Sequence, residues 1–204
     1  MNWGAILFAT IVGYLIGSIP VGFLVSKSYG VNILDFGSGR SGGTNVLRAL
    51  GWGPFILTVC GDALKAAAAI ALARYVLNAG ELGAALAGGF AVVGHNWSIF
   101  LKFRGGAGGV TTGFGLLVLS FYAGAIVVPL AILAFYLSHY ASVGTLTVAL
   151  GSLIALTVLQ IAFPGLAHLE HILFGLIVAV SCTWSLRPNI QRLLNGTERR
   201  VTHW

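Results

Sequence analysis

The sequence predicts an all-α, polytopic integral membrane protein from three features: its hydropathy, its shortage of charge and its long apolar segments. Hydrophobic residues make up 57% of the 204-residue chain and charged residues only 8%, whereas soluble domains carry roughly 25% charged residues. Apolar segments recur to the end of the chain, so one transmembrane domain over residues 1–204 is expected. The first segment lacks a preceding basic region and a small-residue cleavage site, which indicates a retained helix.

Six apolar segments are long enough to cross a bilayer, which takes about 20 residues. They are 4–26, 53–78, 82–101, 114–138, 142–163 and 169–186. The loops 27–52 and 102–113 and the tail are all basic, so the positive-inside rule predicts all three in the cytoplasm. With the first loop inside, the N-terminus lies outside, and a cytoplasmic tail then requires an odd number of crossings. We therefore expect about seven transmembrane helices.

The additional crossing is expected within 114–163, where Pro129, His139 and Ser142 interrupt the apolar run. A short or broken helix there is compatible with a membrane protein if it lines a polar cavity.

The charge pattern and the cysteines exclude several functions. The net charge of +6 is spread thinly, as expected from the positive-inside rule and attraction to anionic lipids. Nucleic-acid binding is not expected, because no basic, aromatic-bearing soluble surface exists. Cys60 and Cys182 lie in apolar segments and are interpreted as small buried hydrophobes. No metal-ligand spacing and no Ser–His–Asp pattern occurs, so we expect neither a metal nor a cofactor.

A polar, glycine-rich loop, "GSGRSGGTNVLR" (Gly37–Arg48), interrupts the apolar sequence. Glycines allow successive backbone N–H groups to form an anion-binding nest, often at a helix N-terminus. Arginine guanidinium groups can bind phosphate through two parallel hydrogen bonds. Thr44 or Asn45 is expected to cap the helix that follows. The alternative is a flexible interfacial loop without a ligand.

A second loop of the same kind follows on the same predicted face. "GHNWSIFLKFRGGAGGVTTGFG" (Gly94–Gly115) contains Lys102 and Arg104, then a run of glycines, then two threonines. Two glycine-rich basic loops facing one compartment indicate two phosphate groups, or one phosphate held from both sides.

Three further polar features lie in or beside the apolar segments. Asp62 and Lys65 are three residues apart and share a helix face; they form either a structural pair or a site in which Lys65 faces substrate. His95 is interpreted either as a structural hydrogen-bonding group or as a ligand. The tail "SLRPNIQRLLNGTERR" fits an interfacial helix with snorkelling arginines, which explains its Asn189 and Glu198 less well than its arginines.

Taken together, these segments resemble the bacterial acyl-phosphate:glycerol-3-phosphate acyltransferase (PlsY) family. "GSGRSGGTNVLR" is similar to the family pattern GSGNxGATNxxR, and "GDALKA" to D-x-L-K-G. "GHNWSIFLKFRGGAGGV" is similar to GHxxPxFxxFKGGKGVAT, "HYASVGTLT" to the Y-x-S-L region, and "NIQRLLNGTE" to NIxRLxxGxE. The order and spacing agree over essentially the whole chain.

The resemblance implies seven transmembrane helices in the bacterial inner membrane, with the N-terminus outside and the active site and C-terminus cytoplasmic. It implies transfer of a fatty acyl group from acyl phosphate to the 1-hydroxyl of glycerol 3-phosphate, giving lysophosphatidic acid and phosphate. Both substrates carry phosphate, which explains two anion-binding loops. Partners are then these substrates and membrane lipid; the oligomeric state is left open.

The resemblance also implies the site residues. The residues expected to act in catalysis are Ser38, Arg48, Lys65 and Asn189. The residues expected to bind substrate are Gly37, Gly39, Arg40, Gly43, Thr44, Asn45, His95, Arg104, Gly105, Gly106, Gly108, Ser142, Arg192 and Glu198. No residue is a compelling general base, so a phosphate oxygen of the substrate is expected to take the hydroxyl proton.

The chain departs from the family pattern at several positions. Ala107 stands where GGKG has its Lys, and Gly109 is an apparent extra glycine. The family's R-H-x-x-N reads Ser185-Leu186-Arg187-Pro188-Asn189, so the Arg and the His are missing, and Arg40 replaces the Asn of GSGN. One hypothesis is that Arg40 supplies the charge lost at position 107. The alternatives to a working acyltransferase are a diverged homologue and, less in keeping with polar groups on one face, a small transporter of a phosphorylated solute.

Overall fold

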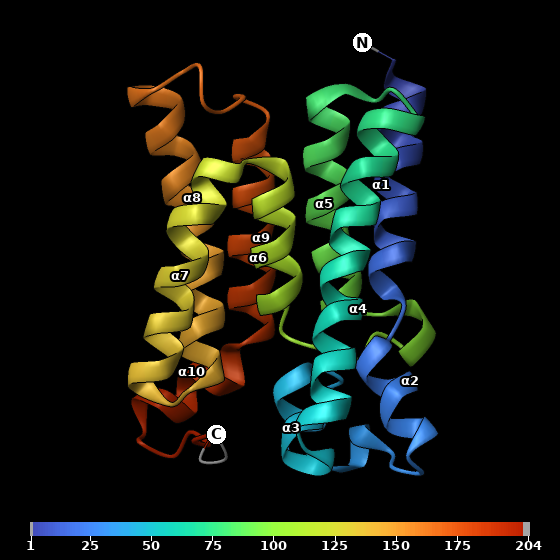
Figure 1. Ribbon diagram of the computed structural model, residues 1–204, viewed down its shortest axis with the longest axis vertical. Coiled ribbons are helices and arrows are strands. Elements are labelled where there is room, and N and C mark those ends of the chain that lie inside the picture. Colours follow the sequence, from blue (N-terminus) through green and yellow to red (C-terminus); the bar gives the residue numbers. More distant parts are fainter. Residues whose placement is uncertain (1, 202–204) are drawn as a thin grey trace.

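The computed structural model describes residues 2–201, and its regular elements there are helices (Figure 1). The α-helices are α1 (Trp3–Ser18), α2 (Val21–Ser28), α3 (Gly43–Leu50), α4 (Trp52–Ala71), α5 (Gly80–Asn96), α6 (Gly109–Leu119), α7 (Phe121–Ser138), α8 (Ala141–Ala162), α9 (His171–Ser185) and α10 (Arg187–Leu194). Short 3-10 helices are η1 (Ile33–Asp35) and η3 (Ile99–Leu101), and η2 (Leu72–Val76) is a π-helical continuation of α4. The predicted all-α class is confirmed.

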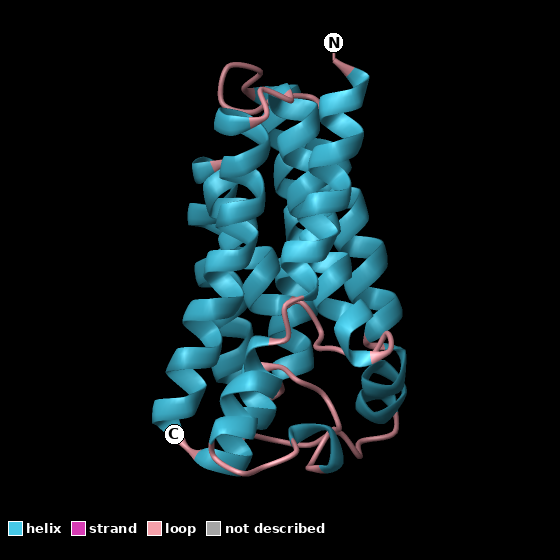
Figure 2. Ribbon diagram, turned by 90° about the vertical axis from the view of Figure 1, so that its right-hand side faces the viewer, coloured by secondary structure: helices cyan, strands magenta, loops and turns pink. Residues whose placement is uncertain are grey.

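The long helices run along the long axis of one bundle, and the connecting segments divide between its two ends (Figure 1). The helix α1 begins at one end, called here the far end. The helices α2, α3 and α10 and the α5–α6 connection lie at the opposite end, called the site end (Figures 1 and 2). The three basic segments expected on one face therefore gather at one end of the bundle.

The apolar helices make the chain a multi-pass integral membrane protein. Among the described residues, four helical segments have the length and hydropathy of a membrane span: Trp3–Ser28, Trp52–Val76, Phe121–Ser138 and Ala141–Ala162. A fifth candidate is α9 with α10, which are bent by 63° relative to each other. The helix α6 is apolar but has only 11 residues.

The break expected within 114–163 is present, but its first position is Ser120 and not Pro129, so the segment 114–138 is not one helix. It contains the end of α6 and all of α7, and the two are separated by Ser120 in an extended conformation (φ −143°, ψ 98°). Pro129 lies inside α7 and does not end it. A Cβ atom on Gly124 would lie 2.7 Å from the Leu117 Cα, so glycine there lets α7 fold back against α6.

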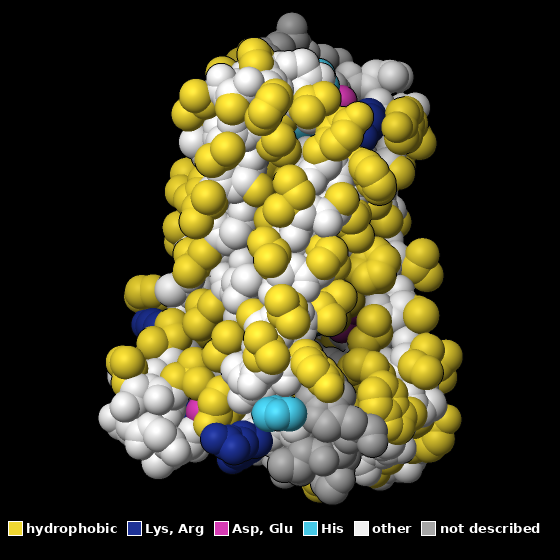
Figure 3. All heavy atoms as spheres, turned by 60° about the vertical axis from the view of Figure 1, so that its left-hand side comes forward, with side chains coloured by type: hydrophobic (Ala, Val, Ile, Leu, Met, Phe, Trp, Pro, Cys, Tyr) yellow, Lys and Arg dark blue, Asp and Glu magenta, His cyan; other side chains and the backbone are white. Residues whose placement is uncertain are grey.

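The bundle places small side chains inside and large apolar side chains outside. Interior positions of α4 and α5 are largely alanine and glycine, including Ala66, Ala84 and Ala87, whereas Leu64, Ile132 and Ile154 are more than half exposed. Small residues let helix backbones approach closely in a membrane, where apolar surface can remain in contact with lipid. Figure 3 shows apolar side chains covering most of the visible face, with few charged groups among them.

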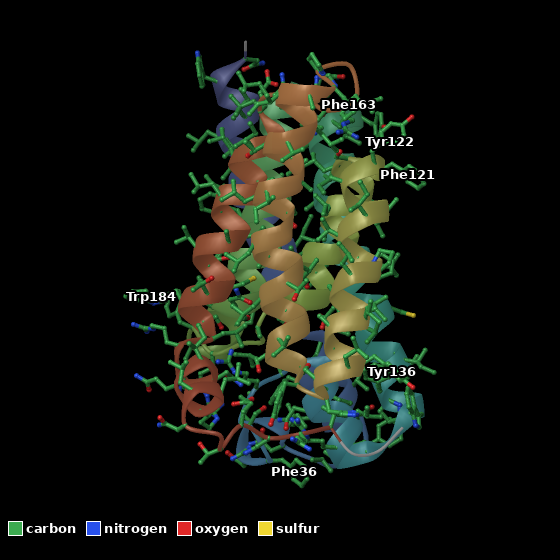
Figure 4. The ribbon with its side chains drawn as sticks, turned by 90° about the vertical axis from the view of Figure 1, so that its left-hand side faces the viewer. Phe36, Phe121, Tyr122, Tyr136, Phe163 and Trp184 are labelled. Atoms are coloured by element: carbon green, nitrogen blue, oxygen red, sulfur yellow. The ribbon has the colours of Figure 1, made fainter. Side chains whose placement is uncertain are left out.

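Aromatic side chains mark both ends of the apolar band. Figure 4 shows Phe121, Tyr122 and Phe163 near the far end, and Phe36 and Tyr136 near the site end. Such aromatic rings are typical of the two interfaces between a bilayer and water.

Candidate functional site

Three segments distant in sequence meet at the site end of the bundle (Figure 2): the loop before α3, the glycine loop before α6, and the α9–α10 corner. The Ser41 N–H donates to the Gly105 carbonyl (3.3 Å), which joins the first two segments. The Gly106 N–H donates to the His95 carbonyl (2.9 Å), which anchors the glycine loop to the end of α5. The two glycine-rich loops predicted to face one compartment are therefore in direct contact.

The three segments surround a polar pocket of about 280 Å³. It is lined by Gly39, Arg40, Asn96, Trp97, Phe103, Arg104, Gly105, Gly106, Trp184, Ser185, Arg187 and Pro188. The described lining contains three guanidinium groups and no carboxylate. Guanidinium groups and the backbone amides of glycine loops are the groups that bind phosphate in proteins, so this pocket suits an anion.

An apolar groove of about 520 Å³ lies beside the polar pocket, between α5 and α9. It is lined by Phe90, Val93, Trp97, Leu176, Ile177, Val180, Ser181 and Trp184. Trp97 and Trp184 line both the groove and the pocket, and Figure 4 shows Trp184 pointing outward from α9. A molecule with an anionic head and an apolar tail could occupy both.

Arg40 lies at the centre of the three segments. Its Nη1 donates to the Gly106 carbonyl (2.9 Å) and the Ser185 Oγ (2.8 Å), and its Nη2 donates to the Ser185 carbonyl (2.5 Å) and the Asn189 Oδ1 (3.3 Å). Burial lowers the pKa of the Arg40 guanidinium from its ordinary value, and the nearby positive charge of Arg192 lowers it further. Arginine nevertheless remains charged in proteins.

Glu198 organises the predicted tail residues. One of its oxygens accepts from the Asn189 Nδ2 (2.7 Å) and from the Ser142 Oγ (3.5 Å), and the other from the Arg192 Nε (2.8 Å). Since Asn189 also contacts Arg40, the predicted residues Ser142, Asn189, Arg192 and Glu198 form one network that reaches the pocket.

The Asn45 side chain makes hydrogen bonds within the first loop and does not line the pocket. Its side chain is 3% exposed. Its Nδ2 donates to the carbonyls of Ile33, Phe36 and Arg40, and its Oδ1 accepts from the Ser38 N–H. The predicted helix cap is wrong, because Gly42 is the N-cap of α3 and no side chain bonds there. Asn45 lies inside the first turn and reaches back to the preceding loop.

The other predicted residues of the first loop divide between the pocket and its surroundings. Gly39 lines the pocket, and both Gly37 and Gly39 have positive φ (55° and 68°), a conformation that favours glycine. Gly43 packs against Phe55 and Val59 of α4, and Thr44 follows it in the first turn of α3.

Arg48 lies on α3 beside the tail, where its Nη2 donates to the Arg199 carbonyl (3.3 Å). Partial burial lowers the pKa of the Arg48 guanidinium, and Arg199 adds to the decrease. Both Arg48 and Arg192 lie near Glu198: Arg192 is paired with its carboxylate (2.8 Å), and the negative charge of Glu198 partly offsets the lowered pKa of Arg48.

Lys65 and His95 lie beneath the glycine loop. The Lys65 Nζ is 2.9 Å from the Asp62 Oδ1 and donates to the Ile19 carbonyl (3.2 Å); the His95 Nδ1 is 3.4 Å from the same Asp62 oxygen. The His95 ring lies directly against Gly106, since a Cβ there would meet its Cε1 at 2.8 Å. Neither side chain lines the pocket. His95 contacts the glycine loop directly, and Lys65 is linked to it only through the Asp62 oxygen that the two share.

The glycine loop supplies Gly105 and Gly106 to the pocket, and Gly108 (φ 81°) is the N-cap of α6. Arg104 lines the pocket from the outer side and donates from Nη2 to the Leu34 carbonyl (3.0 Å), another link between the first two segments.

Sequence reasoning missed several lining residues: Asn96, Trp97, Phe103, Trp184, Ser185, Arg187 and Pro188. The two tryptophans end apolar segments beside basic ones, a position typical of the membrane interface, and this signal could have identified them. Ser185 carries no such signal, because its role depends on the distant Arg40.

Comparisons with known proteins agree over nearly the full chain. The family model described as glycerol-3-phosphate acyltransferase matches residues 7–196. The chain is 40% identical over 199 residues to the glycerol-3-phosphate acyltransferase of Thermus thermophilus (97% of this chain, 96% of the relative). It is 40% identical over 196 residues to glycerol-3-phosphate acyltransferase 1 of Deinococcus radiodurans (96% and 95%).

Two solved structures share the fold. Both are crystal structures of PlsY (YgiH), an integral membrane glycerol 3-phosphate acyltransferase, one in its glycerol 3-phosphate form and one in its lysophosphatidic acid form. The TM-scores are 0.84 and 0.82 at 28% and 29% identity, covering 96% of this chain and 95% and 94% of theirs.

Proposed function

The chain belongs to the glycerol-3-phosphate acyltransferase family, and from this premise we propose that it transfers a fatty acyl group from acyl phosphate to the 1-hydroxyl of glycerol 3-phosphate. The products are lysophosphatidic acid and inorganic phosphate. The observation that carries the proposal is the polar pocket with three guanidinium groups, which joins an apolar groove at Trp97 and Trp184. An acyl phosphate and a lysophosphatidic acid both have this combination of anionic head and apolar tail.

Acyl phosphate is a mixed anhydride and is already activated, so the protein mainly orients the reactants and stabilises charge. The oxygen of the glycerol hydroxyl attacks the acyl carbon, the bond between that carbon and the phosphate oxygen breaks, and phosphate leaves. The hydroxyl proton goes to a phosphate oxygen, since no described side chain of the pocket lining is a carboxylate or a histidine.

The residues divide into three roles in this proposal. Arg40, Arg104 and the Gly105 and Gly106 amides bind one phosphate. Arg48 and Arg192 are assigned to the other, while Glu198 fixes Asn189 and Arg192 in place. Ser38, whose N–H bonds Asn45 in the first loop, remains a predicted catalytic residue. Lys65 and His95 act indirectly, by supporting the glycine loop.

The proposal includes the arrangement in the membrane. The chain is a single domain over 1–204 that crosses the inner membrane seven times, by α1 with α2 and by α4, α5, α6, α7, α8 and α9. The N-terminus is outside and the site end cytoplasmic, where glycerol 3-phosphate is available. The basic residues gathered at the site end support this orientation.

The experiment is to incubate the purified protein in lipid with acyl phosphate and to measure phosphate release and lysophosphatidic acid formation. We expect release only when glycerol 3-phosphate is present, with one lysophosphatidic acid formed for each phosphate. Glycerol in place of glycerol 3-phosphate is the matched control for the acceptor phosphate. Release without an acceptor, or no release by folded protein, would contradict the proposal.

A further inference from the structure

Three positions at which the chain departs from the PlsY sequence pattern meet at one point in space. The pattern has Asn at position 40, Lys at 107 and Arg at 185, whereas this chain has Arg40, Ala107 and Ser185. The Arg40 Nη1 is 2.9 Å from the carbonyl oxygen of Gly106, the neighbour of Ala107, and 2.8 Å from the Ser185 Oγ. The guanidinium of Arg40 therefore lies beside positions 107 and 185, the two positions at which this chain lacks the cation of the family pattern.

The contacts of Arg40 are suited to an anion-binding cation. Its four hydrogen bonds go to two carbonyls, one hydroxyl and one amide oxygen, so none of them neutralises its charge. Among residues 2–201, the ion pairs do not include Arg40. The four bonds use the four Nη hydrogens and hold the guanidinium in place, so an anion in the pocket would meet its uncompensated charge and the remaining Nε N–H.

The other two guanidinium groups of the pocket are placed differently. Arg104 is exposed and bonds the first loop through the Leu34 carbonyl. Arg187 is exposed and stacks on the Trp184 ring, 3.5 Å from its centroid. Arg40 is therefore the inner cation of the pocket, the one closest to the junction of the glycine loop and the α9–α10 corner.

We propose that Arg40 is a relocated phosphate-binding guanidinium, which supplies from the first loop the charge that the family pattern places at position 185. Ser185 is the complementary change, because its small side chain leaves room for the Arg40 guanidinium and its hydroxyl accepts one hydrogen bond from it. The Ser185 backbone carbonyl accepts a second. This inference rests on the proposed function for the identity of the phosphate carrier, acyl phosphate. Phosphate binding itself can be tested without turnover.

The experiment compares Arg40→Asn with the double variant Arg40→Asn/Ser185→Arg, which returns the guanidinium to position 185. Two quantities are measured: kcat and KM for acyl phosphate, and the rise in unfolding temperature caused by inorganic phosphate. The control is Lys27→Asn, which removes one exposed cation at the same end of the bundle, over the Phe23 ring.

We expect Arg40→Asn to lose about tenfold or more in kcat/KM, the factor typical of a hydrogen-bonded charge, and to lose the stabilisation by phosphate. The double variant should recover kcat/KM to within about threefold of the parent and should again be stabilised by phosphate. Lys27→Asn should change neither kcat/KM nor the stabilisation by phosphate. If Arg40→Asn does not fold, the inference is tested by the double variant alone, through its kcat/KM and its stabilisation by phosphate.

Retained phosphate stabilisation in Arg40→Asn would overturn the inference, as would a double variant that fails to recover it or fails to fold. If the parent protein forms no lysophosphatidic acid, the proposed function is contradicted. The inference on Arg40 is then tested by the rise in unfolding temperature that inorganic phosphate causes.

Discussion

At the scale of single residues, Asn45 shows how a motif residue can act through the backbone. Its four hydrogen bonds hold together the loop that carries Gly39 and Arg40 into the pocket. From the sequence alone, Asn45 is equally compatible with a direct contact to phosphate. Its partners lie up to 12 residues away, and only the folded loop reveals them.

We predict that Asn45→Ala destabilises the protein and impairs turnover together. Leaving buried backbone groups without partners costs about 1–3 kcal/mol for each group, so the unfolding temperature should fall and the pocket should lose its first loop. Thermal unfolding and lysophosphatidic acid formation would be measured side by side. Asn195→Ala, an exposed change at the end of α10, is the control, and equal stability of the two variants would refute this role.

Arg48 is a second cation near Glu198, held by the Arg199 carbonyl of the tail. We predict that Arg48→Ala lowers kcat/KM by about tenfold or more, because a substrate phosphate would lose a charged hydrogen-bonding partner, while the unfolding temperature changes little. Steady-state kinetics in both substrates would show which phosphate is affected. Arg200→Ala removes an exposed cation that contacts Tyr140 and should leave kinetics unchanged. Unchanged activity of Arg48→Ala would remove Arg48 from the site.

At the scale of elements, the packing of α1 on α5 positions the glycine loop. A Cβ on Gly17 would lie 2.5 Å from the Ala91 Cα, and one on Gly94 would lie 2.8 Å from the Ser18 nitrogen. The two backbones are therefore in contact near the end of α5. That end provides the His95 carbonyl that anchors Gly106, so helix packing and the pocket are coupled.

We predict that Gly17→Leu lowers the unfolding temperature and the activity, since a larger side chain must separate α1 from α5 at a cost of about 1–3 kcal/mol or more. Gly53→Leu is the matched control, because no atom lies within 4 Å of a Cβ at that position. Both variants would be followed by thermal unfolding in lipid. Similar behaviour of the two would show that close approach at Gly17 is unimportant.

Helix ends mark the limit of what the sequence predicts at this scale. The apolar segments and the gathering of three basic segments at one end follow from hydropathy and charge, which act over many residues. Charge parity also requires a broken helix within 114–163, but it does not place the break at Ser120, because the flanking residues are as apolar as the rest. That position depends on close packing of α7 against α6 at Gly124, a contact between elements that hydropathy does not record.

At the scale of the whole molecule, charge divides the bundle into two unlike ends. Of the eleven Lys and Arg residues, Lys65 lies within α4, and Arg74 lies near the far end, where it pairs with Glu81 (2.6 Å). The other nine belong to the segments of the site end: Lys27, Arg40, Arg48, Lys102, Arg104, Arg187, Arg192, Arg199 and Arg200. This asymmetry is the pattern that the positive-inside rule describes for a cytoplasmic end, and the polar pocket lies at the same end.

We predict that the site end faces the cytoplasm and the far end faces outward, and cysteine labelling of intact cells can measure this. In a Cys60→Ala background, Gly165→Cys in the exposed α8–α9 loop should react with a membrane-impermeant maleimide. Ser28→Cys at the end of α2 should react only after the cells are opened. Gly165 has open space around it and Ser28 is exposed, so both thiols are accessible once the reagent reaches them. The reverse pattern would place the phosphate pocket outside, where nine cations would have crossed the membrane against the positive-inside rule.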